Sequence, residues 1–480
     1  MNLQNLLEHP QLASVVLQGL CEHTSEVQPD YGFVGIAEDD EALQAHCEHA
    51  VRQGAVALFM DSPEINWSQD IGVPVIQVPH LAKIRGELAA AFYADPSAQL
   101  TCVGVTGTNG KTSVAYHVAD LGARLGMAMG YCGTLGWGEL GELLPSNLTT
   151  PNSIALQRQL ATLRDQGCAG VALEVSSHAL DQGRAQAVGF DYGVFTNLTR
   201  DHLDYHGSVK AYGEAKARLF LEWPLQAAVI NIEDPFGCRL AARTAAPVIT
   251  YGQGGDWQWT SRPVKAGREV RWHTPEGAFE AILPVVADYA IANLTAAAAT
   301  LVAMGYSVDH VIAQLSHLEG VPGRMEVFSA GEHAPQVVVD YAHTPDALSK
   351  ALTALQSDAV GKLVCVVGCG GNRDQGKRPE MGRNAATLAD VTWFTADNPR
   401  HENVETIIAE MRSTLTPEML ADTHVCLDRA EAIRQAIINA EAHDVVLIAG
   451  KGHEAFQEIG DRRVPFDDRK IVAHTLREHA

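Results

Sequence analysis

The sequence predicts an α/β protein built from three domains. The chain has 480 residues, which is more than a single hydrophobic core usually serves. A glycine-rich turn near residue 107 stands between an apolar, strand-like run and a helix-like segment. After about residue 323, strand-like and helical stretches alternate, a pattern typical of a mainly parallel sheet. We therefore expect two larger α/β domains, preceded by a smaller one.

The small N-terminal α/β domain is expected over residues 1–95. Apolar runs at Ala55–Met60 and Val73–Val78 predict strands, and Asp40–Gly54 predicts a helix. This part of the chain contains no catalytic motif. We therefore look for the chemistry of the protein in the two following domains.

The central domain is expected over residues 96–322 as a P-loop ATPase-like α/β domain, and the C-terminal domain over 323–480 as a Rossmann-like doubly wound domain. The segment GVPG at Gly320–Gly323 predicts a linker, because Gly and Pro interrupt regular structure. Strands of the C-terminal domain are predicted at Gln336–Asp340, Leu363–Gly368, Asp390–Thr395 and Asp444–Ala449.

The composition predicts a soluble, cytoplasmic protein. Hydrophobic residues make up 46% of the chain and charged residues 19%, and no apolar run reaches the roughly 18 residues of a membrane helix. The N-terminus has no basic residue before its apolar stretch, so we expect no signal peptide. Nine cysteines are scattered along the chain, and the one close pair, Cys365 and Cys369, lies in a strand-like run. Reduced thiols and no zinc site are therefore expected.

The net charge of −23 restricts the possible partners. Nucleic acids and anionic membranes bind basic patches, so neither is expected as a partner. If the substrates are themselves anionic, their binding site must be locally positive. Lysine, arginine, helix N-termini or Mg²⁺ would supply that charge.

The run LTCVGVTGTNGKTS predicts a phosphate-binding loop. A strand at Leu100–Val105 leads into the glycine-rich turn, and a helix is expected to start near Lys111. Backbone N–H groups of such a turn bind phosphate oxygens, Lys111 would reach the β- and γ-phosphates, and the Thr112 hydroxyl would coordinate Mg²⁺. The spacing departs from the standard pattern, which has Gly where this chain has Val105. A simple tight turn is the alternative. The predicted ATP-binding residues of the loop are Gly107, Thr108, Asn109, Gly110, Lys111, Thr112 and Ser113.

Two further polar runs of the central domain predict metal and anion binding. In VALEVSSHALDQGR, Glu174 ends a strand and is a natural Mg²⁺ ligand, whereas Ser176, Gln182 and Arg184 could hold an anionic substrate. A buried glutamate with local partners is the alternative for Glu174. In FTNLTRDHLDYHG, acidic and histidine residues crowd a short loop, and His202 could give a nitrogen to a second Mg²⁺.

Three strand ends of the C-terminal domain carry charged and amide groups. Ligands of doubly wound sheets bind at the carboxyl ends of the strands. These loops offer two arginines, two carboxylates and backbone amides, a mixture that suits a zwitterionic amino acid. Surface salt bridges are the alternative. The predicted amino-acid-binding residues are Arg373, Asp397, Asn398, Arg400, Gly450 and Glu454.

From about residue 95 to the end, the chain resembles the Mur ligase family in a series of motifs in the expected order. The series is GVTGTNGKTS, LTTPNS, EVSSHALDQGR, TNLTRDHLDYHG, GRMEV, DYAHTPDAL, GCGGNRDQGKRP, DNPR and AGKGHE. The first of these also resembles the ATP loop of folylpolyglutamate synthetases, so the loop alone does not choose between the two.

The resemblance implies roles for individual residues. It makes the N-terminal domain a UDP-substrate-binding domain, and it implies that Lys216 is carbamylated and so changed from a cation to an anion. A solvated helix lysine is the alternative. The implied metal ligands are Thr112, Glu174, His202 and carbamylated Lys216. The implied ligands of a UDP-muramoyl dipeptide are Thr149, Thr150, Ser176, Gln182 and Arg184. Further ATP-binding residues are Asn293, Arg324, Asp340 and His343, and the catalytic residues are Lys111, Lys216, His202 and Arg324.

The activity that the resemblance implies is ATP-dependent amide ligation. The motif DNPR marks family members that add meso-diaminopimelate to UDP-N-acetylmuramoyl-L-alanyl-D-glutamate through an acyl phosphate, in peptidoglycan precursor synthesis. We therefore expect Mg²⁺ as cofactor, ATP and the other two small molecules as substrates, and a monomer. The alternatives are an L-lysine-adding ligase, a folylpolyglutamate synthetase-like ligase, and a nucleotide-binding regulatory or scaffold protein without turnover.

Two segments depart from the family pattern. His23, Thr24 and Ser25 stand where the first domain of the family usually carries Asp-Ser-Arg. The stretch ADYAIAN, which ends at Asn293, lacks the family's usual Gly and Phe-Asn pair. Contacts with the uridine and with the adenine are therefore expected to differ from the family pattern.

Overall fold

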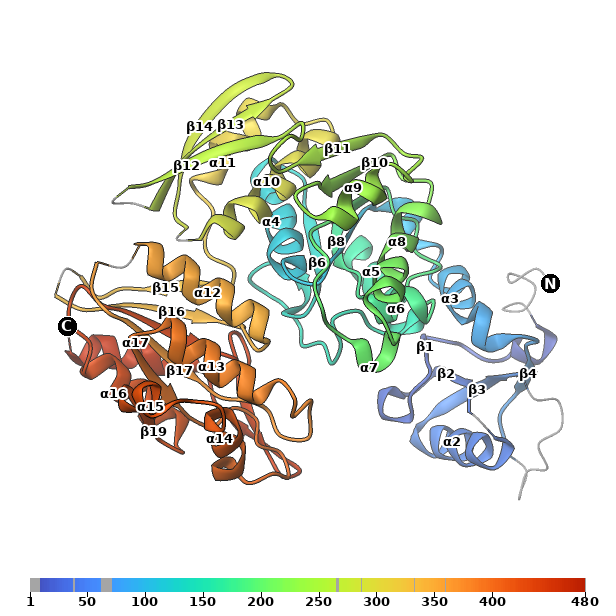
Figure 1. Ribbon diagram of the computed structural model, residues 1–480. Helices are drawn as coiled ribbons and strands as arrows, with labels where there is room; N and C mark the ends of the chain where they lie inside the picture. Colours follow the sequence, from blue (N-terminus) through green and yellow to red (C-terminus); the bar gives the residue numbers. More distant parts are fainter. Residues whose placement is uncertain are drawn as a thin grey trace. The chain divides into compact units, whose positions relative to one another are not determined.

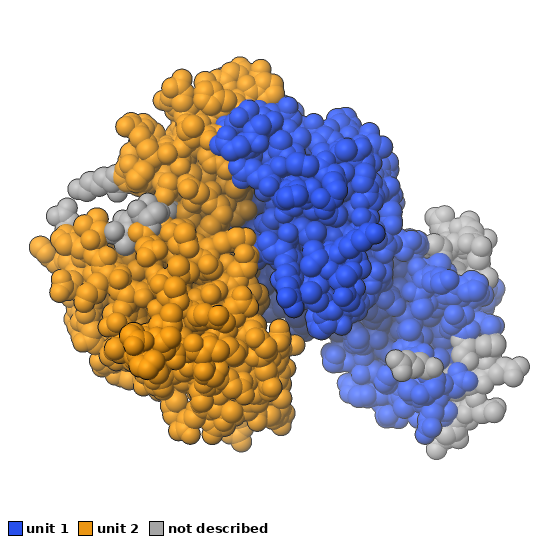
Figure 2. Space-filling view, viewed as in Figure 1, with its two compact units in different colours: residues 1–258, 295–311 blue, residues 259–294, 312–480 orange. Residues whose placement is uncertain are grey.

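A computed structural model describes residues 9–37, 39–61, 71–264, 267–285, 287–331, 333–358 and 360–479. The chain divides into two compact units, coloured separately in Figure 2. Unit 1 comprises residues 1–258 and 295–311, and unit 2 comprises 259–294 and 312–480. The expected boundary near residue 95 lies inside unit 1, so the division into three domains stays a prediction.

Unit 1 begins with a four-stranded parallel sheet in the order β1-β2-β3-β4. Helix α2 starts where the Asp39 side chain accepts a hydrogen bond from the N–H of Ala42, and it ends at Gly54, whose φ of 111° is left-handed. The prediction of a strand at Ala55–Met60 is confirmed, and the predicted helix ends one residue early. The elements are η1 (Pro10–Leu12), β1 (Gly19–Cys21), η2 (Thr24–Glu26), β2 (Tyr31–Gly35), α2 (Asp40–Gln53), β3 (Ala55–Met60), β4 (Val75–Gln77) and α3 (Leu81–Phe92).

The second sheet of unit 1 has seven strands in the order β11-β10-β9-β5-β8-β6-β7 (Figure 1). All of its neighbouring strands are parallel except β6 and β7. The strands are β5 (Thr101–Thr106), β6 (Met129–Gly133), β7 (Gly136–Glu139), β8 (Gly170–Glu174), β9 (Tyr192–Phe195), β10 (Ala227–Asn231) and β11 (Val248–Tyr251). The helical segments are η3 (Pro96–Gln99), α4 (Lys111–Arg124), α5 (Ser153–Asp165), α6 (Ser177–Asp181), α7 (Leu203–His206), α8 (Val209–Leu221) and α9 (Pro235–Ala241).

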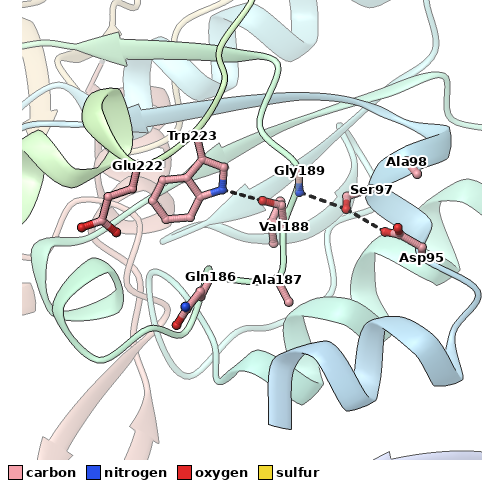
Figure 3. A pocket seen from close by; sticks show the side chains of 9 residues that line it. All are labelled: Asp95, Ser97, Ala98, Gln186, Ala187, Val188, Gly189, Glu222 and Trp223. Atoms are coloured by element: carbon pink, nitrogen blue, oxygen red, sulfur yellow. Dashed lines mark hydrogen bonds between the residues drawn. The ribbon is translucent and has the colours of Figure 1, made fainter. Parts of the chain in front are cut away.

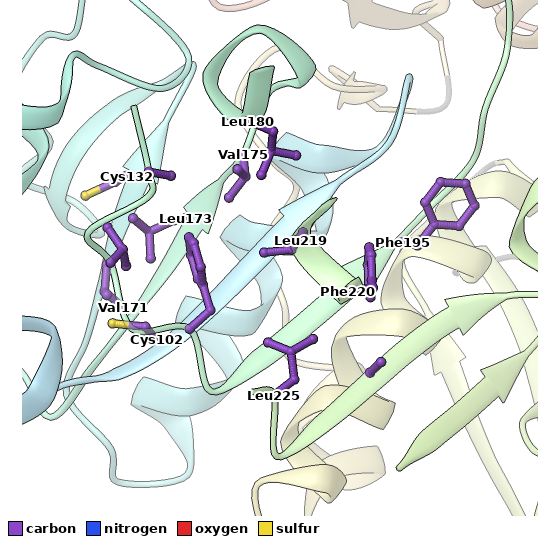
Figure 4. Close-up of a cluster of buried hydrophobic side chains, with 14 of the residues drawn as sticks. Cys102, Cys132, Val171, Leu173, Val175, Leu180, Phe195, Leu219, Phe220 and Leu225 are labelled. Atoms are coloured by element: carbon purple, nitrogen blue, oxygen red, sulfur yellow. The ribbon is translucent and has the colours of Figure 1, made fainter. Parts of the chain in front are cut away.

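A hydrophobic core fixes this sheet against its helices. Val171 and Leu173 of β8 pack in one buried cluster with Leu219 and Phe220 of α8 (Figure 4). Alternate residues of β8 thus face the same layer, as the pleat of a strand requires. The packing holds the carboxyl ends of β5, β8 and β9 side by side, which positions the loops described below.

Unit 2 contains a six-stranded sheet in the order β15-β16-β20-β17-β18-β19 (Figure 1). Only the pair β15–β16 is antiparallel. The strands are β15 (Glu326–Phe328), β16 (Gln336–Asp340), β17 (Leu363–Val367), β18 (Val391–Phe394), β19 (Thr423–Val425) and β20 (Val445–Ala449). The helices are α12 (Pro345–Asp358), α13 (Arg378–Leu388), α14 (Val404–Arg412), α15 (Pro417–Ala421), α16 (Arg429–Ile438) and α17 (Asp468–His479).

Both faces of the six-stranded sheet are buried. Along β17, Leu363 and Cys365 belong to one core cluster, whereas Val364 and Val366 belong to another. Such two-sided burial is typical of a doubly wound parallel sheet, and the α/β fold class predicted for this part of the chain is confirmed. The predicted strand at Gln336–Asp340 has the observed bounds, and the other three predicted strands are each one or two residues shorter in the structure.

The remaining elements complete the described chain. A three-stranded sheet comprises β12 (Gln258–Val264), β13 (Gly267–Thr274) and β14 (Gly277–Leu283), and two helices follow, α10 (Asp288–Ala303) and α11 (Val308–Leu315). A hairpin of β21 (Phe456–Ile459) and β22 (Arg462–Pro465) follows β20. All nine cysteines are free. Within the described ranges, no helix is long and apolar enough to span a membrane.

Candidate active site

The glycine-rich turn joins β5 to α4 as the sequence predicts. Helix α4 begins at Lys111, and Gly107 and Gly110 have positive φ angles of 152° and 86°. A Cβ atom at Gly107 would lie 1.8 Å from the Oγ1 atom of Thr196, so no other residue fits there without displacing the loop. The backbone can therefore approach a bound group closely at this point.

The loop is tied to the segment that follows the neighbouring strand β9. The Oδ1 atom of Asn197 accepts a hydrogen bond from the N–H of Asn109 at 3.0 Å, and the carbonyl of Asn197 accepts one from the N–H of Thr108 at 2.8 Å. The hydroxyl of Thr196 donates to the carbonyl of Asn109 at 2.6 Å. These bonds hold the turn in one conformation before any phosphate binds, which lowers the entropic cost of binding.

Two lysine side chains converge on the same carbonyl group. The Nζ atom of Lys111 donates to the carbonyls of Gly107 and Thr108, both at 2.9 Å, and the Nζ atom of Lys216 donates to the carbonyl of Gly107 at 2.8 Å. Lys216 is buried, with 1% of its surface exposed, so it is not a solvated surface lysine. Burial lowers the pKa of Lys216 well below its ordinary value, and the charge of Lys111 lowers it further. Lys111 thus brings positive charge to the site in a chain of strongly negative net charge.

Glu174, at the end of β8, lies next to Thr112, and both residues are predicted Mg²⁺ ligands. Its Oε2 atom accepts a hydrogen bond from the Thr112 hydroxyl at 2.9 Å. Its Oε1 atom accepts from the Tyr131 hydroxyl at 2.5 Å and from the N–H of Thr134 at 2.8 Å. Tyr131 and Thr134 were not predicted, because nothing in the sequence marks β6 and the residue after it as part of a site.

The residues predicted to hold the UDP-muramoyl dipeptide form a hydrogen-bonded group beside Glu174. The hydroxyl of Thr150 donates to the carbonyl of Glu174 at 2.8 Å and accepts from the N–H of Ser176 at 3.0 Å. The guanidinium of Arg184 donates to the carbonyl of Thr150 and to the Oε1 atom of Gln182, both at 2.8 Å. Thr149 lies 3.1 Å from Thr134 between the hydroxyl oxygens. The five residues are therefore neighbours.

His202 precedes α7 in a left-handed conformation, with φ at 51°. Its ring packs edge-on against the ring of His178, with centroids 4.8 Å apart. Burial lowers the pKa of His202, which favours the neutral form that binds metals. The described residues contain no group of three or more His, Cys, Asp or Glu side chains that could hold a metal ion. Of the four predicted metal ligands, Thr112 and Glu174 are in direct contact with each other.

In unit 2, three of the predicted ATP-binding residues lie close to one another. The buried carboxylate of Asp340, at the end of β16, accepts hydrogen bonds from the N–H groups of Met325 at 2.8 Å and of Ala342 at 2.9 Å. Burial raises the pKa of this carboxyl group. The guanidinium of Arg324 stands over the ring of Tyr341 at 4.4 Å, and the ring of His343 packs against the same tyrosine ring, with centroids 4.6 Å apart.

The fourth ATP-binding residue predicted outside the loop, Asn293, lies half-buried on α10.

The predicted amino-acid-binding loops follow the adjacent strands β20, β17 and β18. Asn398 and Glu454, from two of these loops, share a hydrogen bond of 2.8 Å. Lys451 joins them: its Nζ atom donates to Asn398 at 2.9 Å and to Glu454 at 2.7 Å, and its side chain is fully buried. Lys451 was not predicted, although it stands inside the motif AGKGHE.

Arg400 connects the other loops. Its φ of 49° is left-handed, and its Nη1 atom donates to the carbonyl of Gly371 at 2.9 Å. Its Nη2 atom forms an ion pair with Glu458 at 2.8 Å, with about a fifth of each side chain exposed. Arg373 lies exposed in the loop after β17. The structure thus brings the predicted loops together and adds one unpredicted carboxylate.

The buried Arg429 supports two of these loops through hydrogen bonds to their backbone. The guanidinium of Arg429 forms a bidentate pair with Asp468, at 2.9 and 2.7 Å, and neither side chain is exposed. It also donates to the carbonyls of Ala396 at 3.2 Å and Ala449 at 2.9 Å. These carbonyls directly precede Asp397 and Gly450. The sequence gives no signal for this role, because Arg429 begins an ordinary helix.

A separate pocket of about 460 Å³ lies in unit 1 and contains none of the predicted site residues (Figure 3). Its polar groups bond to one another: the indole of Trp223 donates to the carbonyl of Val188 at 2.7 Å, and the hydroxyl of Ser97 accepts from the N–H of Gly189 at 3.0 Å. Glu222 on its rim is paired with Arg218. The pocket offers no group suited to the chemistry of the phosphate loop.

Comparisons with family models and with individual proteins indicate the same family. The model of the Mur ligase middle domain matches residues 105–301, and the model of the Mur ligase glutamate ligase domain matches residues 323–452. A UDP-N-acetylmuramoyl-L-alanyl-D-glutamate–2,6-diaminopimelate ligase of Xylella fastidiosa is 42% identical over 98% of this chain and 96% of its own length. The protein of the same name from Pseudomonas aeruginosa is 44% identical over 94% of this chain and 93% of its own length.

The chain belongs to the Mur ligase family. It is therefore an ATP-dependent ligase, and the two matched regions include the phosphate loop and the loops of unit 2.

Solved structures support the Mur ligase fold over the full chain. A solved 2,6-diaminopimelate ligase of this family is 33% identical, covers 96% of this chain and 95% of its own, and superposes with a TM-score of 0.68. A folylpolyglutamate synthase of Mycobacterium tuberculosis reaches a TM-score of 0.64 at 19% identity, and it covers 76% of this chain and 92% of its own. The second likeness shows a shared fold alone. The substrates of this Mur ligase must therefore be argued from its own residues and its near relatives.

Proposed function

We propose that this Mur ligase adds meso-diaminopimelate to UDP-N-acetylmuramoyl-L-alanyl-D-glutamate, at the expense of ATP, in the synthesis of peptidoglycan precursors. The observation that carries the proposal is the similarity to relatives that bear the name of this activity. They are 41–44% identical over nearly the whole chain. The motif DNPR, with its Arg400, supports the choice of amino acid.

The first step is the activation of the acceptor. The γ-carboxylate of its D-glutamyl residue attacks the γ-phosphorus of ATP, the bond to the β-phosphate oxygen breaks, and ADP leaves. Backbone N–H groups of the loop from Gly107 to Gly110 and the ammonium of Lys111 hold the phosphates. The glycine conformations of the turn and the position of the Lys111 side chain against it suit this role. Arg324, with its planar fork of donors, is assigned to the charge on the transferred phosphoryl group.

The residues around Glu174 fit a magnesium ion. Thr112 and Glu174 offer a hydroxyl and a carboxylate in contact, and Mg²⁺ prefers oxygen ligands of this kind. His202, whose neutral form burial favours, is assigned to a second ion. Bound Mg²⁺ would screen the repulsion between the carboxylate and the phosphates of ATP. Thr134 and Tyr131 hold the Glu174 carboxylate in position through their hydrogen bonds to it.

Lys216 is proposed to be carbamylated. The reaction joins the neutral amine nitrogen to the carbon of CO₂ and releases one proton, so it requires an uncharged amine. Burial lowers the pKa of Lys216 well below its ordinary value, which favours that form. The product is an anion that Lys111 and the metal ions would balance.

The second step forms the amide. The neutral amino group of meso-diaminopimelate attacks the carbonyl carbon of the acyl phosphate, the bond to the phosphate oxygen breaks, and inorganic phosphate leaves as the nitrogen loses a proton. Arg400 is assigned to the distal carboxylate of the amino acid, because a guanidinium can bind a carboxylate through two parallel hydrogen bonds. The other residues assigned to the amino acid are Arg373, Asp397, Asn398, Gly450 and Glu454.

The proposal includes three properties beyond the reaction. The partners are the three small-molecule substrates, without nucleic acid or membrane, because the net charge of −23 opposes binding to polyanions. The protein acts as a monomer in the cytoplasm, where the nucleotide-linked acceptor and ATP are available.

A coupled assay of phosphate release tests this function. It uses the UDP-muramoyl dipeptide with meso-diaminopimelate, L-lysine or L-glutamate, and a reduced folate with L-glutamate as a second acceptor pair. Turnover with meso-diaminopimelate, preferred over L-lysine by kcat/KM, is expected. Equal kcat/KM for L-lysine, or an Arg400→Ala variant that keeps the full preference, would contradict the amino-acid assignment. Turnover with the folate pair alone would indicate the synthetase-like activity instead, and no turnover with any pair would indicate a nucleotide-binding protein.

A further inference from the structure

The pocket of Figure 3 lies at the edge of the seven-stranded sheet opposite to the phosphate loop. Its lining residues belong to three segments that each precede a strand: 95–98 precedes β5, 186–189 precedes β9 and 222–223 precedes β10. These strands are neighbours in the order β10-β9-β5. The phosphate loop follows the other end of β5. A ligand in this pocket would therefore be separate from the substrates of the ligase.

Hydrogen bonds and ring packing hold the walls of the pocket in place. The indole of Trp223 donates to the carbonyl of Val188 at 2.7 Å, and its ring packs edge-on against Phe190, with centroids 5.5 Å apart. The hydroxyl of Ser97 accepts from the N–H of Gly189 at 3.0 Å. The volume of about 460 Å³ is within the range of small-molecule sites. Because these walls are already ordered, a ligand would lose little affinity to their ordering.

The pocket carries negative charge at two opposite ends. Figure 3 shows the carboxylate of Glu222 on one side and that of Asp95 on the other, with Trp223 and Val188 between them. Among the described residues that line the pocket, none is basic. The lining thus suits a ligand with a positive charge at each end and an apolar middle.

Both carboxylates can accept a further hydrogen bond. The Oδ1 atom of Asp95 accepts from the Ser97 hydroxyl at 3.2 Å. The two oxygens of Glu222 accept from the guanidinium of Arg218 at 2.8 and 3.0 Å. The side chain of Glu222 is 47% exposed, so solvent weakens this ion pair. Since a carboxylate has about four lone-pair sites, these contacts leave acceptor capacity at both ends of the pocket.

The backbone gives neither carboxylate a favourable position. Ala94 and Asp95 are both left-handed, with φ angles of 59° and 45°, a conformation that costs energy in residues other than glycine. Glu222 caps the C-terminus of α8, where the helix dipole repels an anion, and Arg218 one turn earlier offsets part of this repulsion. A cation bound at Glu222 would relieve the rest. Residues that oppose local stability are typical of functional sites.

We propose that this pocket binds a linear aliphatic diamine, as a ligand additional to the three substrates. One ammonium group would donate to the carboxylate of Asp95 and the other to that of Glu222. The methylene chain would cross the apolar surface of Trp223 and Val188, and the indole ring would attract the nearer ammonium. The net charge of −23 favours the approach of such a cation. The inference does not depend on which amino acid the enzyme adds.

Isothermal titration calorimetry on the full chain, without nucleotide or substrates, tests the proposal. The probes are the diamines putrescine and cadaverine, with the monoamine n-butylamine for comparison. Physiological salt screens the general attraction between cations and the negative chain. At least one diamine should bind at a single site, about tenfold or more tighter than n-butylamine, because its second ammonium adds a charge-assisted hydrogen bond.

Asp95→Asn and Glu222→Gln remove one charge each and keep the shape of the side chain. Asparagine also tolerates the left-handed conformation of residue 95. Each variant should bind the diamine about tenfold more weakly. Both should keep the wild-type kcat of the ligase, which shows that they are folded. Asp165→Asn, which changes another exposed carboxylate of unit 1, is the matched control and should keep the wild-type affinity.

Three results would overturn the diamine site. The first is no binding of either diamine, and the second is equal affinity for the diamines and n-butylamine. The third is equal diamine affinity of the wild type, Asp95→Asn and Glu222→Gln, which would show general association with a negative surface. A wild-type enzyme that is inactive with meso-diaminopimelate would instead overturn the proposed function and leave the diamine site standing.

Discussion

The phosphate loop of unit 1 and the amino-acid loops of unit 2 are built in different ways. The phosphate loop is one continuous segment, and its shape depends on Gly107 and Gly110 and on bonds to the end of the adjacent strand. The amino-acid loops follow three strands far apart in the sequence and are joined by charged side chains such as Arg400 and Lys451. The first site is fixed mainly by backbone geometry, and the second mainly by charge pairing.

This difference indicates where changes in the amino-acid sequence are tolerated. A side chain at Gly107 would collide with Thr196 and displace the loop, whereas a site held by ion pairs can change its partner charges and its substrate together. We assign the phosphate loop to ATP, the substrate that these ATP-dependent ligases share. The loops of unit 2 are therefore the place where a Mur ligase would adapt to a different amino acid.

The largest effect on turnover is expected from Lys111→Ala, in the phosphate loop. Removal of its ammonium leaves the phosphates without their nearest cation, so turnover should fall about 10³-fold or more. Circular dichroism should show an unchanged fold. The substitution removes two side-chain hydrogen bonds, to the carbonyls of Gly107 and Thr108, and leaves the backbone bonds of the loop in place. Lys210→Ala on the exposed side of α8 is the control and should be fully active. Near-normal rates for Lys111→Ala would remove the assignment.

A large effect is also expected from Lys216→Ala, because the substitution removes the proposed carbamate from the same site. Activity should fall by about 10²- to 10³-fold, and short carboxylates at millimolar concentration should restore part of it. Burial lowers the pKa of Lys216 and so favours the neutral amine that reacts with CO₂. An enzyme freed of CO₂ should then recover activity when bicarbonate is added, and a ¹³C-bicarbonate label should appear as a carbamate signal. Full activity of Lys216→Ala would end the idea.

Asp468→Asn tests the site in unit 2 that depends on charge pairing. This change leaves the buried guanidinium of Arg429 without its counter-charge, so unfolding free energy should drop by about 3–5 kcal/mol. Because Arg429 also holds the carbonyls before Asp397 and Gly450, the KM for the amino acid should rise as well. Glu431→Gln, on the exposed face of α16, removes a surface pair and should change stability by less than about 1 kcal/mol. Thermal unfolding curves that coincide for both variants would contradict the supporting role of Arg429.

The smallest effect is expected from Ser25→Arg in unit 1, where the sequence departs from the family pattern. Arg85 and Arg158 already stand beside this segment, paired with Glu22 at 3.3 Å and with Glu26 at 3.6 Å. An added arginine at the exposed Ser25 should therefore change the KM for the UDP-muramoyl dipeptide by less than about threefold. Ser25→Gln controls for side-chain length. A large improvement with arginine alone would show that a uridine pocket of the family type persists there.

The sequence by itself determined the parts of this protein that depend on neighbouring residues. The start of α4 at Lys111, the strand at Gln336–Asp340 and the order of the motifs could be predicted, because glycine conformations, apolar runs and helix starts are local properties. The tertiary structure alone decided which distant side chains meet. Lys216 reaches the carbonyl of Gly107 across 109 positions, and Glu458 comes to lie beside Arg400. Burial and charge pairing act between such residues only after the sheets have formed. The local pattern of neither segment therefore predicts these contacts, and Lys216 was assigned to the site by the family resemblance alone.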